Sequence, residues 1–332
     1  MTATAGLQDT FGRQIGYVRL SVTDRCDFRC VYCMAEDMAF LPRSEVLSIE
    51  ELEQLAKAFV ALGVEKIRLT GGEPLIRAGI VDLVARLKRL QGLKQLVLTT
   101  NGSRLKQLAQ PLKDAGLDRI NISLDTLNPE RFRQMTRTGR LQDVLDGIAA
   151  VQDAGFVGTK LNCVLLNGYN QDDVLELLAF AKQQQLDLTF IEEMPLGQID
   201  SHQRAASQIS SDQVLAMLRR QVTLYPVIES SGGPARYFRM PDSPIRIGLI
   251  SPNSHNFCGD CNRVRVTATG RLLLCLGHEI GVDLLPTLRN ALLQQTALKL
   301  QIQQAMSLKP ERHFFNPDEP PQLVRFMNMT GG

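Results

Sequence analysis

Apolar and polar residues alternate in several short runs within the first 195 residues of the chain. The clearest run covers 119–125, where Ile120, Ile122 and Leu124 have one parity and Asn121, Ser123 and Asp125 have the other. Such alternation indicates a β-strand with one apolar and one polar face. Parallel strands that are buried on both faces would instead be almost continuously apolar. The pattern therefore predicts strands that pack against helices on one side and present polar groups on the other.

Runs of this kind alternate with amphipathic helical segments. The predicted strands are 15–22, 65–70, 94–100, 119–124, 159–166 and 188–193. The predicted helices are 48–63, 79–91, 104–116, 141–155 and 170–185. The first helix has the clearest ends, because Ser48 and Glu51 form a capping box and Gly63 terminates it. This order predicts an α/β fold with an incomplete, open (β/α)6 barrel, whose lumen is lined by the polar parity.

The regular alternation of predicted strands and helices stops near residue 196. A polar loop over about 196–210 is followed by a helix near 211–220, short strands and a final helix near 293–308. The last residues are rich in turn formers and end in Gly331-Gly332, which predicts an extended tail. We therefore predict a partial barrel over 1–195 and a C-terminal α+β region over 196–332.

Composition and charge narrow the possible partners. The 332 residues are 44% hydrophobic and 22% charged, which is typical of a globular protein. A formal net charge of +2 gives no general attraction to nucleic acids or anionic membranes. The N-terminal residues lack a signal-peptide pattern, and no apolar stretch approaches the roughly 20 residues of a membrane span. We expect a cytoplasmic location, where clustered cysteines stay reduced and serve as metal ligands.

A first group of three cysteines directly follows the first predicted strand. Cys26, Cys30 and Cys33 have the spacing C-x3-C-x2-C. A cubane iron–sulfur cluster usually has four thiolate ligands, so three would leave one iron open to a small molecule. The loop also lies at the carboxyl end of a barrel strand, where active sites of such folds gather. We therefore predict a [4Fe–4S] cluster that takes part in chemistry.

The second predicted strand ends in a double glycine, Gly71-Gly72, followed by Glu73. A double glycine is often only a turn. At the end of a barrel strand it also allows the backbone to approach a ligand closely, because glycine has no Cβ atom.

A second group of three cysteines lies in the C-terminal part. Cys258, Cys261 and Cys275 are again one ligand short of four. Because His278 follows Cys275 by three residues, the spacing also fits a closed tetrahedral zinc site. The remaining Cys163 lies in an apolar run and is interpreted as a small core residue.

Basic residues occupy the polar parity of three predicted strands. They are Arg19, Lys66, Arg68 and Lys160. Charges that point into a lumen without partners cost several kcal/mol each, so an anionic ligand such as a triphosphate is expected there. The alternatives are ion pairs with Asp125, Glu73 or Glu193, or a parity that faces solvent.

The first cysteine group, with aromatic Tyr32 before its last cysteine, resembles the signature of the radical S-adenosylmethionine (SAM) superfamily. The resemblance implies that SAM ligates the open iron and that the Gly-Gly-Glu segment binds its amino group. By the same resemblance, the SAM-binding residues are Tyr32, Gly71, Gly72, Glu73, Ser123 and Met194.

Over the whole chain, the sequence resembles the family of radical SAM enzymes that cyclise GTP in molybdenum cofactor biosynthesis. The matching segments are RLSVTDRCDFRCVYC, EKIRLTGGEPLIR, LTTNG, INISLDTL, FCGDCNRVRVTATGRLLLC and the terminal Gly-Gly. The resemblance implies a second [4Fe–4S] cluster, on Cys258, Cys261 and Cys275, whose open iron holds the guanine. It implies GTP contacts by Arg19, Lys66, Arg68, Thr99, Lys160, Arg263, Val264 and Arg265, with Arg19, Arg263 and Arg265 as catalytic residues.

That family's reaction is the expected function. Cleavage of SAM would give a 5′-deoxyadenosyl radical that abstracts the ribose 3′ hydrogen of GTP, leading to 3′,8-cyclo-7,8-dihydro-GTP. The expected partners are GTP, a reductant such as flavodoxin or ferredoxin and a second copy of the chain in a homodimer, and neither nucleic acid nor membrane. The sequence departs from the family at Asp27, Ala35 and Thr189, where Asn, Pro and, in several members, Arg are usual.

Two other functions are considered. A peptide-modifying radical SAM enzyme with an auxiliary cluster commonly has more C-terminal cysteines and does not need so basic a lumen. An electron carrier or a zinc-stabilised binding module is the other class, but two ferredoxin-type clusters would need eight thiolates. Iron and sulfide content separates these classes.

Overall fold

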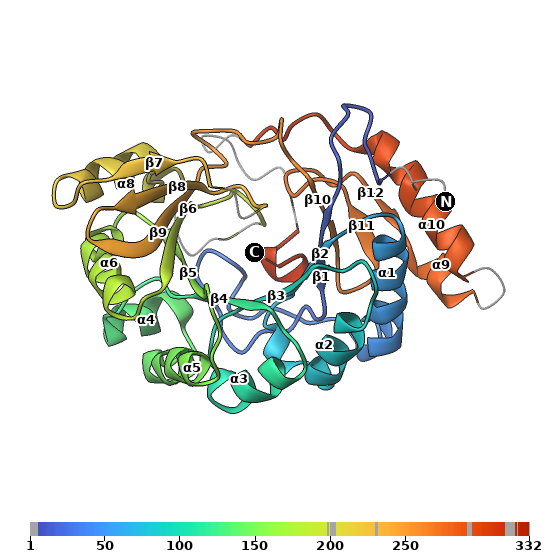
Figure 1. Cartoon of the computed structure of the whole chain (residues 1–332), viewed down its shortest axis with the longest axis horizontal. Helices are drawn as coiled ribbons and strands as arrows, with labels where there is room; N and C mark the ends of the chain where they lie inside the picture. The colour runs from blue at the N-terminus through green and yellow to red at the C-terminus, as the bar shows by residue number, and fades with distance from the viewer. Residues whose placement is uncertain are drawn as a thin grey trace.

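A parallel sheet forms the centre of the protein. The computed structural model describes residues 6–197, 199, 204–229, 232–290, 294–315, 323 and 325–331. The central strands are β1 (Tyr17–Ser21), β2 (Lys66–Thr70), β3 (Gln95–Thr100), β4 (Arg119–Ser123), β5 (Lys160–Leu165) and β6 (Asp187–Glu192). They pair in chain order, each parallel to the next. The sheet curves without closing, which confirms the predicted open barrel (Figure 1).

Strands from the C-terminal part extend this sheet at both ends. Next to β6 lie β9 (Ser243–Ile250), β8 (Arg236–Met240) and β7 (Tyr225–Val227), and β9 is parallel to β6. Next to β1 lie β10 (Arg263–Val266), β11 (Arg271–Leu273) and β12 (Gly281–Asp283), and β10 is parallel to β1. The C-terminal part therefore continues the barrel wall on both sides. A domain boundary at 195/196 stays a prediction.

Helices cover the outer face of the central sheet (Figure 1). The predicted ones form as α1 (Ile49–Ala61), α2 (Ile80–Lys88), α3 (Leu105–Asp114), α5 (Leu141–Asp153), α6 (Val174–Gln183), α8 (Ser211–Arg219) and α10 (Gln294–Ala305). The capping box of α1 is present, because the Glu51 N–H donates to Ser48 Oγ at 3.1 Å and the Ser48 N–H donates to Glu51 Oε2 at 2.7 Å. Three further helices were not predicted, namely α4 (Pro129–Thr136), α7 (Arg204–Ser207) and α9 (Leu285–Arg289).

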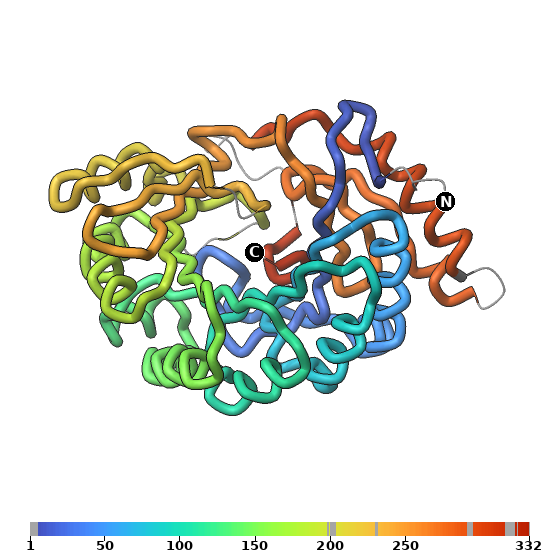
Figure 2. The backbone as a smooth tube through the Cα atoms, viewed as in Figure 1, coloured from blue at the N-terminus to red at the C-terminus, as the bar shows by residue number. Residues whose placement is uncertain are grey.

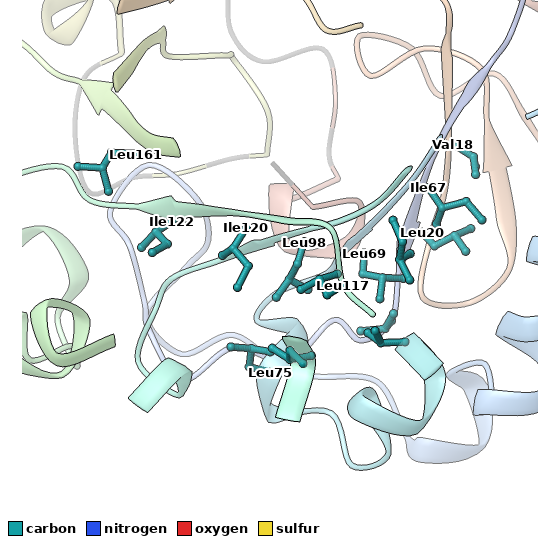
Figure 3. Packing of buried hydrophobic residues seen from close by; sticks show 14 of the residues in the cluster. Val18, Leu20, Ile67, Leu69, Leu75, Leu98, Leu117, Ile120, Ile122 and Leu161 are labelled. Atoms are coloured by element: carbon teal, nitrogen blue, oxygen red, sulfur yellow. The ribbon is translucent and has the colours of Figure 1, made fainter. Parts of the chain in front are cut away.

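The hydrophobic core lies between the strands and these helices. Figure 3 shows that the apolar residues of neighbouring strands point to the same side, among them Leu20, Leu69, Leu98 and Ile122. All four side chains are fully buried. The opposite parity therefore faces the inside of the barrel, as the alternating pattern predicts. Cys163 is a buried core residue whose thiol lies 3.6 Å from the Asp125 carbonyl oxygen.

The last described residues run inside the ring of strands rather than over its outer surface (Figures 1 and 2). They form a single helical turn, η5 (Met327–Met329), and end at Gly331. The side-chain amide of Asn328 donates to the carbonyl oxygen of Asp24 at 2.8 Å, next to the first cysteine loop. The predicted tail residue Gly332 lies outside the described residues. In the part of the chain that the structure describes, no helix has the length and hydrophobicity of a membrane span.

Candidate active site

The first cysteine loop, in which Cys26 lies five residues after the end of β1, is attached to the barrel by hydrogen bonds. The Tyr32 hydroxyl donates to Asp125 Oδ2 at 2.7 Å, and Asp125 follows β4 closely. On the other side, the Asp27 carboxylate accepts from the Asn101 side-chain amide and from the Ser103 hydroxyl, both at 2.7 Å. Both donors follow β3. Asp27, which stands where the family usually has Asn, therefore acts here only as a hydrogen-bond acceptor.

The three cysteines of this loop are half-buried and lie close enough to influence one another's pKa. Burial raises the pKa of Cys33 to about 12, and burial together with the neighbouring Cys33 and Cys26 raises the pKa of Cys30 well above its ordinary value. Without metal these thiols are therefore protonated, and iron would take the place of the protons. Three soft sulfur donors on one loop fit a [4Fe–4S] cluster with one open iron.

The Gly71-Gly72-Glu73 segment packs directly against this cysteine loop. The Gly72 N–H donates to the Thr23 carbonyl at 2.9 Å, and the Glu73 N–H donates to the Arg25 carbonyl at 2.7 Å. A Cβ atom on Gly72 would lie 2.2 Å from the Arg25 carbonyl oxygen. Gly71 has φ +147° and would place a Cβ 2.5 Å from the Thr23 carbonyl oxygen. The two glycines are therefore required for this close backbone contact, not only for a turn.

The Glu73 carboxylate is buried in a polar pocket of its own. It accepts from the Thr100 hydroxyl and the Asn101 N–H, both at 2.7 Å, and from the Leu75 N–H at 2.9 Å. Burial raises its pKa to about 7 in spite of these hydrogen bonds. These contacts also join the glycine segment to the end of β3.

The strand register arranges basic side chains in two rows across β10, β1 and β2. In one row Arg19 on β1 lies between Arg265 on β10 and Arg68 on β2. In the other row, two residues earlier on each strand, Tyr17 lies between Arg263 and Lys66. All six positions have the parity that faces the lumen. These rows lie beside a common pocket, which is lined by Arg19, Lys66, Arg68, Thr99, Lys160, Met194, Arg263, Val264 and Arg265 among others.

The phenol of Tyr17 is the acidic group at the centre of the two rows. It accepts a hydrogen bond from Arg68 Nε at 2.6 Å, and the ammonium of Lys66 lies 4.9 Å from its ring centre. Burial alone would raise the pKa of Tyr17, but Arg68, Arg19 and Lys66 together lower it to about 6. A phenolate at this position would offset one of the surrounding positive charges.

Several buried nitrogens of the pocket have no hydrogen-bond partner among the described residues. They are Nε and Nη2 of Arg19, Nε of Arg119 and Nε of Arg263. Burial lowers the pKa of Arg19 to about 10 and that of Lys66 to about 8. The three carboxylates that the sequence suggested as ion-pair partners of the basic residues have other contacts. Asp125 accepts from Tyr32, Glu73 accepts from Thr100, and Glu193 pairs with Arg204 at 3.1 Å. The pocket is therefore suited to a polyanion.

The opposite wall of the pocket contains residues that were not predicted as site residues. Arg119 on β4 lines it, and so does Tyr237 on β8, whose hydroxyl is hydrogen-bonded to the ammonium of Lys160. Burial lowers the pKa of Lys160 to about 7, and repulsion by Arg119 contributes. Thr189, which replaces the Arg of several family members, is buried on β6 with its hydroxyl unpartnered among the described residues. Arg119 shares its parity with Asn121, so the alternation could have identified it.

The second cysteine group lines the same pocket. Cys258 and Cys261 lie just before β10, and Cys275 lies just after β11, which is antiparallel to β10. Burial raises the pKa of Cys275, and the nearby Cys258 and Cys261 contribute. Burial alone would raise the pKa of Cys261 too, but Lys309 and Arg263 lower it below its ordinary value. These three thiols would hold a second [4Fe–4S] cluster at the pocket and would leave one of its irons without a cysteine ligand.

The zinc alternative has no support in the described part of the chain. No three or more His, Cys, Asp and Glu side chains converge there closely enough to hold a single metal ion. His278 Nε2 lies 3.0 Å from the Arg312 carbonyl oxygen, and its side chain is not part of any such group. A cubane cluster is wider than one ion, so its thiolate ligands stand farther apart than those of zinc.

The C-terminal segment lies between the pocket and the first cysteine loop. Arg265 Nη1 donates to the Gly331 carbonyl at 2.6 Å, and the Thr70 hydroxyl donates to the Thr330 carbonyl at 3.4 Å. The Asn328 N–H is hydrogen-bonded to the Cys33 thiol, where it lowers the pKa that burial raises. The predicted SAM residues Tyr32, Gly71, Gly72, Glu73 and Ser123 are not part of the pocket lining, whereas Met194 is.

Comparison with known proteins agrees with this geometry. Residues 20–181 match the model of the radical SAM superfamily, and residues 186–315 match that of the Molybdenum Cofactor Synthesis C family. A crystal structure of SuiB from Streptococcus suis bound to S-adenosylmethionine superposes with a TM-score of 0.61 at 13% identity, covering 93% of this chain and 77% of that one. The fold and the first cysteine loop thus define a radical SAM enzyme, a class that uses SAM and a [4Fe–4S] cluster.

Curated relatives identify the family within this class. The chain is 58% identical over 326 residues to a GTP 3′,8-cyclase of Marinobacter nauticus, covering 98% of both sequences. It is 58% identical over 327 residues to one of Pseudomonas syringae pv. syringae, again covering 98% of both. The chain belongs to the GTP 3′,8-cyclase family.

Proposed function

We propose that this chain converts GTP to 3′,8-cyclo-7,8-dihydro-GTP with SAM as co-substrate, as a step of molybdenum cofactor biosynthesis. The observation that carries the proposal is the basic pocket that the second cysteine group lines. It combines unpartnered guanidinium nitrogens of Arg19, Arg119 and Arg263 with a second trio of thiols at the pocket wall. A nucleoside triphosphate has the negative charge and the base that such a pocket requires.

The first cysteine group would hold the cluster that supplies an electron for reductive cleavage of SAM. Cys26, Cys30 and Cys33 are its proposed ligands. Gly71 and Gly72 are proposed to let SAM approach the backbone, and Glu73 is proposed to accept a hydrogen bond from its amino group. The remaining residues proposed to contact SAM are Tyr32, Ser123 and Met194.

The second cysteine group would bind the guanine end of the nucleotide. Cys258, Cys261 and Cys275 are proposed to hold the second cluster. The proposed GTP contacts are Arg19, Lys66, Arg68, Thr99, Lys160, Arg263, Val264 and Arg265. To these we add Arg119, because its guanidinium lines the pocket while Thr189 supplies no positive charge there. Arg19, Arg263 and Arg265 are proposed to act in catalysis by fixing the nucleotide and its developing charge.

An anaerobic incubation of the reconstituted protein with GTP, SAM and a reductant tests the proposal. We expect 5′-deoxyadenosine and a cyclised nucleotide to form in equal amounts. Formation of 5′-deoxyadenosine with a peptide but not with GTP would favour the peptide-modifying alternative. Absence of SAM cleavage at a full iron content would favour an electron carrier.

The partners and the location of the protein form part of the same proposal. Reduction of the first cluster requires a one-electron donor, for which a flavodoxin or ferredoxin is suitable. We further propose a homodimer in the cytoplasm that binds neither nucleic acid nor membrane. Light scattering of the purified protein, which should give twice the 36.9 kDa chain mass, tests the dimer.

A further inference from the structure

Lys309 lies at the second cysteine group, although it is distant from it in sequence. It follows α10 and the short helical turn 306–308, and its side chain is buried, with 3% of the residue exposed. Its ammonium donates to the Leu274 carbonyl at 2.6 Å, to the Arg263 carbonyl at 3.2 Å and to Cys261 Sγ at 3.6 Å. These three acceptors match the three donors of a lysine ammonium.

A buried ammonium normally requires an anion. Burying a charge without one costs several kcal/mol, and carbonyl oxygens alone do not neutralise it. Within the described residues, Lys309 forms no ion pair with a carboxylate at 4.0 Å or less, and Cys261 is the ionisable acceptor at its ammonium. A thiolate at Cys261, held by a cluster, would supply the missing negative charge.

We propose that Lys309 is a positioning residue for the second cluster: its ammonium donates to the Cys261 thiolate and stabilises the cluster's reduced state. This inference rests on the second cluster of the proposed function. A [4Fe–4S] centre becomes more negative by one charge when an external one-electron donor reduces it, and a fixed positive charge at a ligand sulfur favours that state. Lys309 therefore raises the reduction potential of this cluster, separately from its contacts with the nucleotide.

The two carbonyl contacts show why this charge is held so firmly. The Arg263 carbonyl lies at the start of β10 and the Leu274 carbonyl directly precedes Cys275. One ammonium thus connects the segment that carries Cys261 to the segment that carries Cys275. If Lys309 served only to join these two segments, its charge would not affect the reduction potential of the cluster. A measurement of that potential therefore separates a structural role from the proposed one.

A redox titration followed by electron paramagnetic resonance (EPR) tests the inference. The full-length holoenzyme is compared with Lys309→Met and Lys309→Arg, and a Cys26→Ala, Cys30→Ala, Cys33→Ala chain assigns the signal of the second cluster. We expect Lys309→Met to lower the equilibrium constant for one-electron reduction of that cluster about tenfold, or about 59 mV. Lys309→Arg, which keeps the charge, should restore most of the difference. An unchanged potential in Lys309→Met at full iron content would overturn the inference.

A second measurement needs no stable variant. In protein labelled with 15N-lysine, the reduced second cluster should show a weak 15N coupling in pulsed EPR, transmitted through the N–H···S contact. The absence of such a coupling in the wild-type protein would contradict the proposal. The proposed function fails separately, if wild-type protein holds only about four irons per chain instead of about eight.

Discussion

Substitution of Gly72 by alanine tests the contact between the glycine segment and the first cysteine loop. The added Cβ would lie 2.2 Å from the Arg25 carbonyl oxygen, 2.5 Å from its carbon and 2.7 Å from the Asp24 carbonyl oxygen. All three atoms are backbone, so no side chain can rotate away. The Arg25 carbonyl must withdraw by roughly 1 Å, which moves the residue next to Cys26.

The magnitude follows from two contributions. Overpacking of this kind costs about 1–3 kcal/mol. The displacement also breaks the 2.7 Å hydrogen bond from the Glu73 N–H to the Arg25 carbonyl, which is worth about 1 kcal/mol. If SAM binding requires the Arg25 carbonyl to return to its native position, the sum of about 2–4 kcal/mol is lost from the binding free energy, which corresponds to a roughly 30- to 700-fold weaker SAM affinity.

Equilibrium binding of labelled SAM to anaerobically reconstituted protein measures this loss. Gly16→Ala is the matched control, because an added Cβ there meets no atom within 4 Å. We expect the control to bind SAM like the wild type. If Gly72→Ala also bound SAM within about threefold of the wild type, the close backbone contact could not be what shapes the SAM site.

Four further substitutions test the basic pocket. Arg119→Met should raise KM for GTP about tenfold and leave SAM binding unchanged, because it removes a guanidinium whose buried Nε has no partner among the described residues; steady-state kinetics with an unchanged KM would contradict this role. Lys160 has a pKa of about 7 because of burial, and a bound triphosphate would raise it, so GTP binding should take up protons and weaken as pH rises from 7 to 9. Lys160→Arg should show smaller uptake by calorimetry in buffers of different ionisation heat, and equal uptake would be evidence against this assignment. Arg263→Ala or Arg265→Ala should slow cyclisation about 100-fold or more while SAM affinity is retained; product analysis showing normal turnover in both would remove them from catalysis.

The sequence was sufficient for the central barrel because its signals are local. Alternation marked each strand from β1 to β6, and the box of Ser48 and Glu51 marked α1. The helix α4 also had a local signal that was missed, since Asn128 caps it and Pro129 occupies its first turn. The parity of Arg19 and Asn121 likewise contained Tyr17 and Arg119, which the structure places in the pocket.

Pairing between distant strands could not be predicted from such signals. The four residues of β10 do not specify a partner, yet their parallel contact with β1 is what brings Arg263 and Arg265 beside Arg19. The same holds for Lys309, which has no periodic or motif signal and reaches Cys261 only through the fold. Local spacing also left His278 open as a zinc ligand, and what argues against that arrangement is that no three such side chains converge on a single ion in the described part of the chain.

Turnover with GTP deuterated at the ribose C3′ tests the central claim most directly. The account predicts that the deuterium appears in 5′-deoxyadenosine, because the SAM-derived radical takes its hydrogen from that carbon of a nucleotide bound in the basic pocket. Formation of unlabelled 5′-deoxyadenosine at the same rate, with or without GTP, would contradict the account.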